Sequence, residues 1–248
     1  LIGDTFQLPP IADNEQWRIL SQFYKTPFFF SSKVIEQNTP LYIELKKIYR
    51  QNEQEFIDLL NRVRVNQVSQ NDLNILNAKY NPTFSGDGND YIILATHNNI
   101  VKDTNLTKLN QLETELYTFE ANETGIFPDK HKPTDHYLKL KVGAQIMFVK
   151  NDTGIIKRYY NGKIGKIKEL QESSIIVIFD NESEVEVERT EWENIKYTYD
   201  KKQKKIKEET IGTFEQFPIR LAWAITVHKS QGLTFEKVIA DLGRAFTS

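Results

Sequence analysis

The 248-residue chain contains no cysteine, so it can form neither a disulfide framework nor a metal site built on thiolates. It has only four histidines, and none of them stands in a spacing typical of metal ligands. No apolar run approaches the roughly 20 residues that span a bilayer. We therefore expect no catalytic metal held by protein side chains alone and no membrane partner. The lack of cysteine also fits a reducing compartment.

A large excess of charge is also missing, because 34 acidic and 32 basic residues give a net charge of −2. A protein that binds nucleic acid over its whole surface normally carries a basic excess, and this chain does not. A local basic groove remains possible, since the field in a cleft depends on the charges that line it. The length and the 39% hydrophobic content fit one large or two modest globular domains.

The stretch 217–232 has apolar residues at the spacing of one helix face. This predicted face consists of Leu221, Ala224, Ile225 and His228. Pro218 suits the first turn of such a helix, and Gly232 suits the position just past its end. Residues 237–242 then predict a buried strand. Polar turns next to core strands are where α/β proteins bind ligands, but an ordinary helix–loop–strand junction has the same pattern.

Other segments indicate a β–turn–α arrangement. Apolar periodicity predicts helices over 54–65 and 71–77, and residues 41–45 resemble a short strand. A buried strand over 91–95 is followed by a helix from about 100 to 117, capped by Asn98 or Asn99. We therefore expect a mostly parallel sheet with helices on both sides. Alternation at period two predicts one more strand within 139–148.

From residue 151 onward the pattern changes to short strands with tight turns. Asn161-Gly162 is a hairpin signal, and Asp180 begins a second turn. The alternating or apolar runs are 163–168, 175–179 and 184–188. Such a series is typical of a small β-barrel. The basic run 201–207 is either a solvated hairpin tip or an arm that contacts phosphates.

Three separated stretches carry a resemblance to a known family. They are Gly3-Asp-Thr-Phe-Gln-Leu-Pro-Pro10, Tyr49-Arg50-Gln51 and the segment Ala222–Gly232, which ends in His-Lys-Ser-Gln-Gly. Their order and spacing resemble the later motifs of superfamily 1 DNA helicases, in the Pif/RecD-like branch that moves 5′ to 3′. Supporting matches are Leu94–Asn98 with Asn105, Val142–Met147 with Asn151-Asp152, and Asn161–Gly165. The resemblance covers nearly the whole chain.

The resemblance implies an α/β fold, namely a RecA-like parallel-sheet domain of the P-loop-NTPase type with an inserted SH3-like β-barrel. Residues 1–31 would be the tail of a first RecA-like domain. Residues 32–151 plus 216–248 would form the second RecA-like domain, and residues 152–215 the barrel. In this family ATP is held between the two RecA-like domains, and single-stranded DNA crosses their top.

The resemblance also assigns residues to the nucleotide side. Gln7 would sense the γ-phosphate or its attacking water, with turn hydrogen bonding as the alternative, and Asp4 would orient the same loop. Arg50 matches the arginine that reaches the γ-phosphate, although a surface ion pair is also open. A planar guanidinium suits the charge that spreads over transferring phosphoryl oxygens. Gln231 and Gly232 would lie toward the nucleotide.

A second group of residues matches positions that contact DNA. The group consists of Thr96, Thr226, His228, Lys229 and Ser230. Hydroxyl groups, imidazole N–H groups and backbone amides contact phosphates without reading sequence, as a translocating motor requires. Trp223 either stacks on bases or packs in the core, and we expect core packing. Arg220 either contacts DNA or covers the predicted helix.

The chain departs from the family in one important respect, because it contains no GxxxxGK[ST] loop to hold phosphates. The resemblance therefore implies the C-terminal motor portion of an ATP-dependent DNA helicase, with ATP and Mg²⁺ bound mostly by a preceding domain. Its partners would be single-stranded DNA and duplex or forked DNA. We expect the 248 residues alone neither to hydrolyse ATP nor to unwind DNA. A non-catalytic nucleic-acid-binding module of degenerate helicase fold and an unrelated α/β domain are the alternatives.

Overall fold

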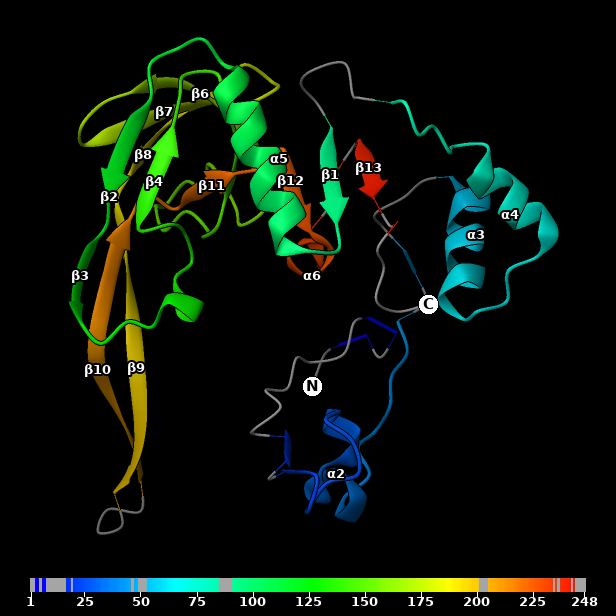
Figure 1. Ribbon diagram of the computed structural model, residues 1–248. Coiled ribbons are helices and arrows are strands. Elements are labelled where there is room, and N and C mark those ends of the chain that lie inside the picture. The colour runs from blue at the N-terminus through cyan, green and yellow to red at the C-terminus, as the bar shows by residue number, and fades with distance from the viewer. Residues whose placement is uncertain are drawn as a thin grey trace. The chain divides into compact units, whose positions relative to one another are not determined.

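The computed structural model describes residues 3–4, 6–7, 17–18, 20–45, 47–48, 53–84, 91–200, 205–233, 235, 237–241 and 243 (Figure 1). The chain divides into two compact units, residues 1–84 and residues 85–248.

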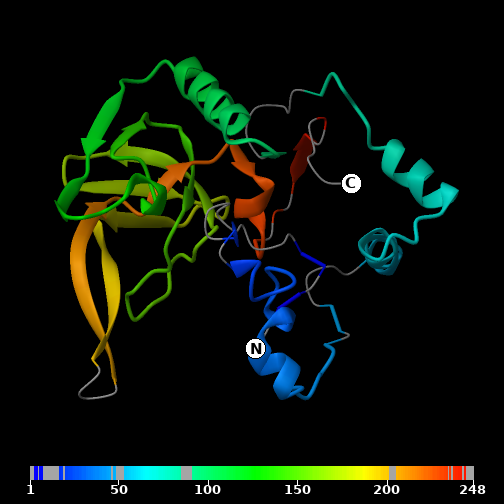
Figure 2. The ribbon, with the colours of Figure 1, turned by 60° about the horizontal axis from the view of Figure 1, so that its bottom comes forward.

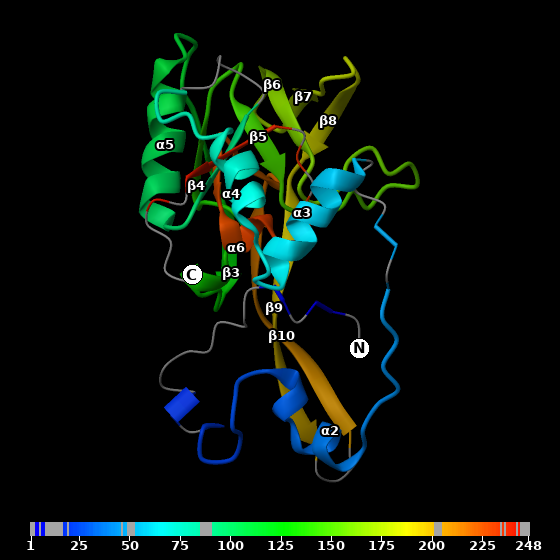
Figure 3. The same cartoon turned by 90° about the vertical axis from the view of Figure 1, so that its right-hand side faces the viewer.

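The first unit is helical in its described part. It contains the 3₁₀ turn η1 (Phe29–Ser31) and the helices α2 (Lys33–Gln37), α3 (Gln54–Arg64) and α4 (Gln70–Asn77) (Figure 3). The helices predicted over 54–65 and 71–77 are thus confirmed. The strand predicted over 41–45 is wrong, because these residues adopt no regular structure and their side chains are exposed.

A buried carboxylate joins α3 to α4. Asp72 completes a capping box with Ser69 at the start of α4, and it accepts two hydrogen bonds from the Arg62 guanidinium, at 2.6 and 2.9 Å. These bonds from Arg62, followed by those from Ser69, hold the pKa of Asp72 well below its ordinary value. The cap satisfies the first N–H groups of α4, which have no partner within the helix.

The second unit contains a three-stranded parallel sheet, as the β–turn–α pattern predicts. Its strands are β1 (Ile92–Ala95), β12 (Ala224–Thr226) and β13 (Val238–Asp241), in the order β12-β1-β13. Helix α5 (Asn98–Gln111) follows β1 and packs against β1 and β12 (Figure 1). The helix ends at Gln111, earlier than the predicted end near residue 117, and β2 (Tyr117–Glu120) begins at that predicted end.

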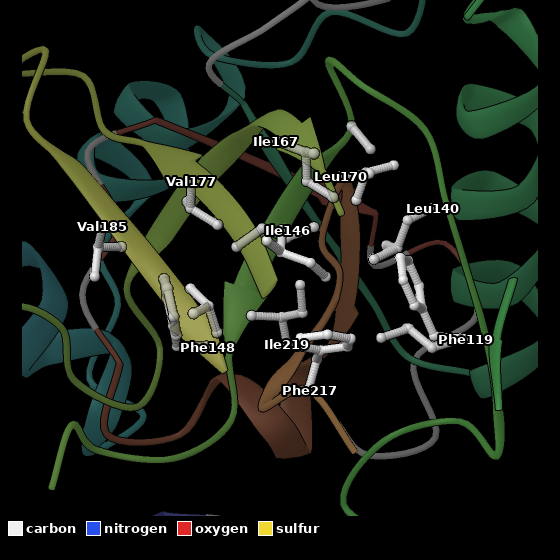
Figure 4. Packing of buried hydrophobic residues seen from close by; sticks show 14 of the residues in the cluster. Phe119, Leu140, Ile146, Phe148, Ile167, Leu170, Val177, Val185, Phe217 and Ile219 are labelled. Atoms are coloured by element: carbon white, nitrogen blue, oxygen red, sulfur yellow. The ribbon is translucent and has the colours of Figure 1, made fainter. Parts of the chain in front are cut away.

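A five-stranded antiparallel sheet contains most of the apolar core. Its strands are β11 (Ile219–Leu221), β5 (Gln145–Phe148), β6 (Ile164–Leu170), β7 (Ser174–Ile178) and β8 (Glu184–Glu188), in that spatial order. The alternation predicted over 184–188 is confirmed, because Val185 and Val187 are buried between exposed glutamates. Figure 4 shows Ile146, Ile167, Val177 and Ile219 meeting in this core.

The antiparallel sheet crosses the domain boundaries expected at 152 and 216. Strand β5 pairs with β6 on one side and with β11 on the other. Thus two strands that the resemblance assigns to the RecA-like domain share one hydrogen-bonded sheet with strands assigned to the barrel. The strand predicted within 139–148 is in fact two, β4 (Tyr137–Leu140) and β5, since Gly143 turns the chain between them at a φ of 87°.

A long hairpin extends from this unit (Figure 2). It consists of β9 (Thr190–Asp200) and β10 (Lys205–Gln216), and β3 (Asn122–Gly125) pairs only with the proximal part of β10. The connecting residues 201–204 of the predicted basic tip lie outside the described residues. The remaining short elements are η2 (Asp129–His131) and the pair β2–β4.

The helix predicted over 217–232 is wrong. The segment forms β11, then β12, and only Val227–Ser230 form a helix, α6. Pairing with strands distant in the sequence determines the structure of this segment, since β11 pairs with β5 and β12 pairs with β1. Two details are confirmed: Gly232, with a φ of 78°, stands just past the end of α6, and Trp223 is packed in the core at 6% exposure.

The strand predicted over 237–242 is present as β13, but it is not buried. Val238, Ala240 and Asp241 are exposed, and Ile239 is half-buried. In the sheet order β12-β1-β13 the strand pairs with β1 on one side, and it has no second neighbouring strand among the described residues.

The loop between β5 and β6 is held by Asp152, which is 3% exposed. Its carboxylate accepts hydrogen bonds from the Gly154 amide at 2.9 Å, the Arg158 amide at 3.1 Å and the Arg158 Nε at 2.8 Å. The pKa of Asp152 lies well below its ordinary value of 3.8, mainly because the Arg158 side chain donates a hydrogen bond to the carboxylate. The loop conformation therefore depends on an ionised carboxylate.

We predict that Asp152→Asn reduces the acid sensitivity of this unit. A carboxylate with a lowered pKa stabilises the fold fully above the unfolded-state value near 3.8, and that stabilisation declines progressively as the pH falls from this value towards the lower folded-state value. Thermal unfolding from about pH 6 to pH 3 should therefore show the wild type losing its advantage over the variant. Asp180→Asn, at an exposed turn residue, is the control. If the difference in unfolding temperature between the wild type and Asp152→Asn stayed constant over this pH range, Asp152 would not be the ionised group that holds the loop.

Candidate nucleic-acid interface

Two of the residues predicted to contact DNA lie at one edge of the parallel sheet. Ala95 of β1 is in register with Thr226 of β12 and with Asp241 of β13. Since all three strands run parallel, their carboxyl ends meet at this edge, and Thr96 follows β1 there. This is the edge at which open α/β sheets bind ligands.

Helix α6 begins at this edge and carries the other predicted DNA contacts. The Thr226 Oγ1 accepts a long hydrogen bond of 3.4 Å from the Lys229 amide, which caps the helix. The Ser230 hydroxyl donates to the Val227 carbonyl at 2.8 Å. Thr226 is itself buried, whereas His228 and Ser230 are half-buried and Lys229 is exposed. Thr226 thus positions the turn, and the side chains after it reach the surface.

The turn after β1 presents a similar arrangement. The Thr96 Oγ1 and the His97 Nδ1 lie 2.8 Å apart, within hydrogen-bonding distance. Thr96 is half-buried, and His97, at the N-cap position of α5, is exposed. His97 was part of the matched motif but was not predicted to be a contact. Because His97 is exposed and lies beside Thr96, we include it among the candidate contact residues at this sheet edge.

Asn105 holds the strand that leads to α6. This residue of α5 is 8% exposed, and its Nδ2 donates to the Ala224 carbonyl at 3.0 Å while its Oδ1 accepts from the Ala224 amide at 2.9 Å. The amide group thus binds the outer edge of β12 as a neighbouring strand would. Gln145 donates to the Ala222 carbonyl at 3.0 Å in the same segment.

Asp4 and Gln7 form a small hydrogen-bonded turn in the first unit. The Asp4 carboxylate accepts from the Phe6 amide at 3.0 Å and from the Gln7 Nε2 at 3.4 Å, and it pairs with Arg64 at 2.6 Å. These contacts fit the loop-orienting role expected for Asp4, which stays a prediction. Gln7 is exposed and makes the turn hydrogen bond that was its alternative role, while γ-phosphate sensing stays a prediction. Arg50 lies outside the described residues.

Gln231 and Gly232 form the exposed turn after α6. Gln231 is the C-cap residue, and Gly232 adopts a φ of 78°. A Cβ on Gly232 would meet no atom within 4 Å. The glycine is therefore required by its backbone conformation, and the space beside it is open.

A cavity of about 570 Å³ contains none of these residues. Three of its lining residues are glutamates, Glu172, Glu186 and Glu188, which would repel phosphate groups. Among the described residues, no group of three His, Asp or Glu side chains is placed to hold a metal ion. Within the same ranges, no helix has the length and apolar character needed to cross a membrane.

No family model matches the chain, but it is similar to known helicases over nearly its full length. It is 30% identical to the ATP-dependent DNA helicase PIF1 of Homo sapiens, with 100% of this chain and 37% of that protein covered. A crystal structure of Bacteroides sp Pif1 in complex with ADP-AlF4 matches with a TM-score of 0.78 and 41% identity, over 96% of this chain and 54% of that one.

The chain is homologous to the Pif1 helicases. It also matches Bacteroides Pif1 bound to ssDNA, with a TM-score of 0.69, 41% identity, and 96% of this chain and 54% of that chain covered. The resemblance inferred from the motifs is thus confirmed. The chain spans just over a third of the human relative, with 37% covered, and about half of the Bacteroides chain, with 54% covered.

We predict that Asn105→Ala lowers the free energy of unfolding by about 2–4 kcal/mol, because the Ala224 amide and carbonyl lose their partner in a buried site. The control is Asn110→Ala on the exposed side of the same helix α5, which should change stability by less than about 0.5 kcal/mol. Denaturant-induced unfolding measures both. Similar effects of the two substitutions would refute the role of Asn105.

Proposed function

We propose that this chain is the C-terminal motor portion of an ATP-dependent Pif1-type DNA helicase that translocates on single-stranded DNA and unwinds duplex or forked DNA. The main support is that the matched motif residues around Thr96 and α6 share the carboxyl edge of one parallel sheet. Similarity to Pif1 helicases over the full chain, including one bound to ssDNA, supports the same conclusion.

The DNA strand crosses this edge in the proposed function. Thr96, His228, Lys229 and Ser230 supply hydroxyl, imidazole and ammonium groups that contact phosphates without selecting a sequence. Thr226 and Asn105 support these contacts, because Thr226 caps α6 and Asn105 holds β12. Because each of these phosphate contacts is weak, a translocating protein can release the DNA strand and bind it again at each step.

The nucleotide side is contributed by Gln7 and Arg50, with Gln231 and Gly232 of the turn after α6. Arg50 stabilises the charge on the transferring γ-phosphoryl group, and Gln7 senses that group or its attacking water. ATP and Mg²⁺ are bound mostly by a preceding RecA-like domain, because this chain contains no phosphate-binding GxxxxGK[ST] loop. Since α6 lies between Thr226 and Gly232, a change in nucleotide state reaches the DNA contacts over a few residues.

The antiparallel sheet β11-β5-β6-β7-β8 is, in this proposal, an SH3-like barrel. Its support is a sheet of five short antiparallel strands, with a register shift between β6 and β7, around a common apolar core. Because β5 and β11 belong to this sheet, the barrel and the RecA-like domain form a continuous structure rather than two parts joined by a linker.

We predict that, in the full-length protein, Arg50→Ala mainly affects ATP turnover and His228→Ala mainly affects DNA binding. Arg50→Ala should reduce ATP turnover by about 10³-fold, the lower end for arginine fingers, while affinity for single-stranded DNA stays nearly unchanged. His228→Ala should weaken DNA affinity by about tenfold, since a lost hydrogen bond to a charged group costs at least about 1.5 kcal/mol. The exposed His131, in η2, supplies the control His131→Ala.

Steady-state ATPase assays and fluorescence anisotropy with a labelled oligonucleotide measure the two quantities. Equal losses of DNA affinity in Arg50→Ala and His228→Ala would contradict the proposed division. Normal DNA binding without any DNA-stimulated ATP turnover in the wild-type protein would favour the alternative of a non-catalytic nucleic-acid-binding module.

A further inference from the structure

His136 lies where two sets of paired strands meet at the base of the hairpin β9–β10. Strand β4, which begins directly after His136, pairs with β2, whereas β3 pairs with β10 of the hairpin (Figure 1). The His136 carbonyl accepts hydrogen bonds from the Ala121 amide at 2.8 Å and from the Gln216 Nε2 at 3.3 Å. These backbone contacts hold His136 in place and do not depend on the charge of its ring.

The imidazole ring of His136 lies between two carboxylates. Its Nδ1 contacts Glu123 of β3, and its Nε2 is 3.5 Å from Glu120 Oε1 at the end of β2. A neutral imidazole has one N–H and one lone pair, so it can donate to only one of the two glutamates while its lone pair faces the other. An imidazolium donates from both nitrogens. The geometry around His136 therefore matches the charged form of the ring.

The Glu123 side of this arrangement is held by a lysine. The Lys132 Nζ is 2.7 Å from Glu123 Oε1 and 2.8 Å from Asp129 Oδ1 of η2. The pKa of Glu123 is lowered, first by the hydrogen bond from Lys132, and the hydrogen bond from His136 acts in the same direction. Glu123 thus stays ionised and presents a negative charge to the ring.

The Glu120 side is held by the strands around it. The Tyr137 hydroxyl of β4 donates to Glu120 Oε1 at 3.3 Å, and the Arg189 Nη1 donates to the Glu120 backbone carbonyl at 2.8 Å. On β10, the Glu215 carboxylate accepts a hydrogen bond from the Asn122 side chain at 2.7 Å. Glu120 is therefore fixed beside the ring by contacts with other residues.

We propose that His136 is a proton-dependent clasp that ties the β2–β4 pair to β3 at the base of the hairpin. Imidazole is the side chain that ordinarily changes its charge between pH 5 and 8. While the ring is charged, it binds Glu120 and Glu123 together. As the pH rises and the ring loses its proton, a lone pair faces one of the carboxylates, and β3 keeps its pairing with β10 but loses part of its attachment to β2 and β4. The clasp does not depend on the proposed function, because its residues are not among the predicted nucleotide or DNA contacts.

Hydrogen exchange in the full-length protein at about pH 6 and about pH 8 tests the clasp, with each rate divided by the intrinsic rate at the same pH. In the wild type, the protection of amides 122–126 should fall about two- to fivefold at the higher pH, the range for a partly exposed ion pair. His136→Asn cannot gain a proton and should show the lower protection at both pH values. Glu120→Gln should show the higher protection at both, because its amide can donate to the lone pair of a neutral ring.

The matched control is His131→Asn, at an exposed residue of η2, which should keep the pH dependence of the wild type. Protection of β3 that is the same at both pH values in the wild type, or that changes equally in the wild type and His136→Asn, would overturn the proposal. If His136→Asn does not fold, Glu120→Gln decides alone, and a loss of protection like that of the wild type refutes the clasp. Absence of DNA binding or ATP turnover in the wild type would refute the proposed function and leave the clasp intact, since exchange at β3 measures neither.

Discussion

The buried amide of Asn105 is the interaction on which the candidate interface depends. Strand β12 pairs with β1 on one side, and on its other side the Ala224 amide and carbonyl both bind Asn105. Without these bonds two backbone groups in a dry site would lack partners, which is costly. Asn105 thus holds the first residue of β12, and α6 begins directly after this short strand, at Val227. The polar side chains after Thr226 take their positions from it.

The elements predicted correctly from the sequence are those determined by local pattern. The β1–α5 unit, α3 and the alternation in β8 each have an uninterrupted periodicity and suitable turn residues. The segment 217–232 was misassigned because its apolar spacing fits one helix face, whereas its structure is decided by pairing with β5 and β1. Those partner strands lie about 70 to 130 residues away in the sequence, beyond the reach of any local pattern.

The candidate site was predictable only in part, for the same reason. The motif residues identified the helicase resemblance and the turn formed by α6, and the structure brings Thr96 and Thr226 to one sheet edge. The sequence could not show that Thr226 would be buried as a helix cap, since its burial follows from its place at the end of strand β12, which pairs with β1.

Hydrogen exchange in the full-length protein, with and without single-stranded DNA, tests the central claim most directly, because it reports the backbone at the proposed edge itself. The account predicts slower exchange for the amides of residues 96–99 and 227–232 when DNA is bound, with no change in β7 and β8. Protection confined to β7 and β8, with unchanged exchange at the sheet edge, would contradict it.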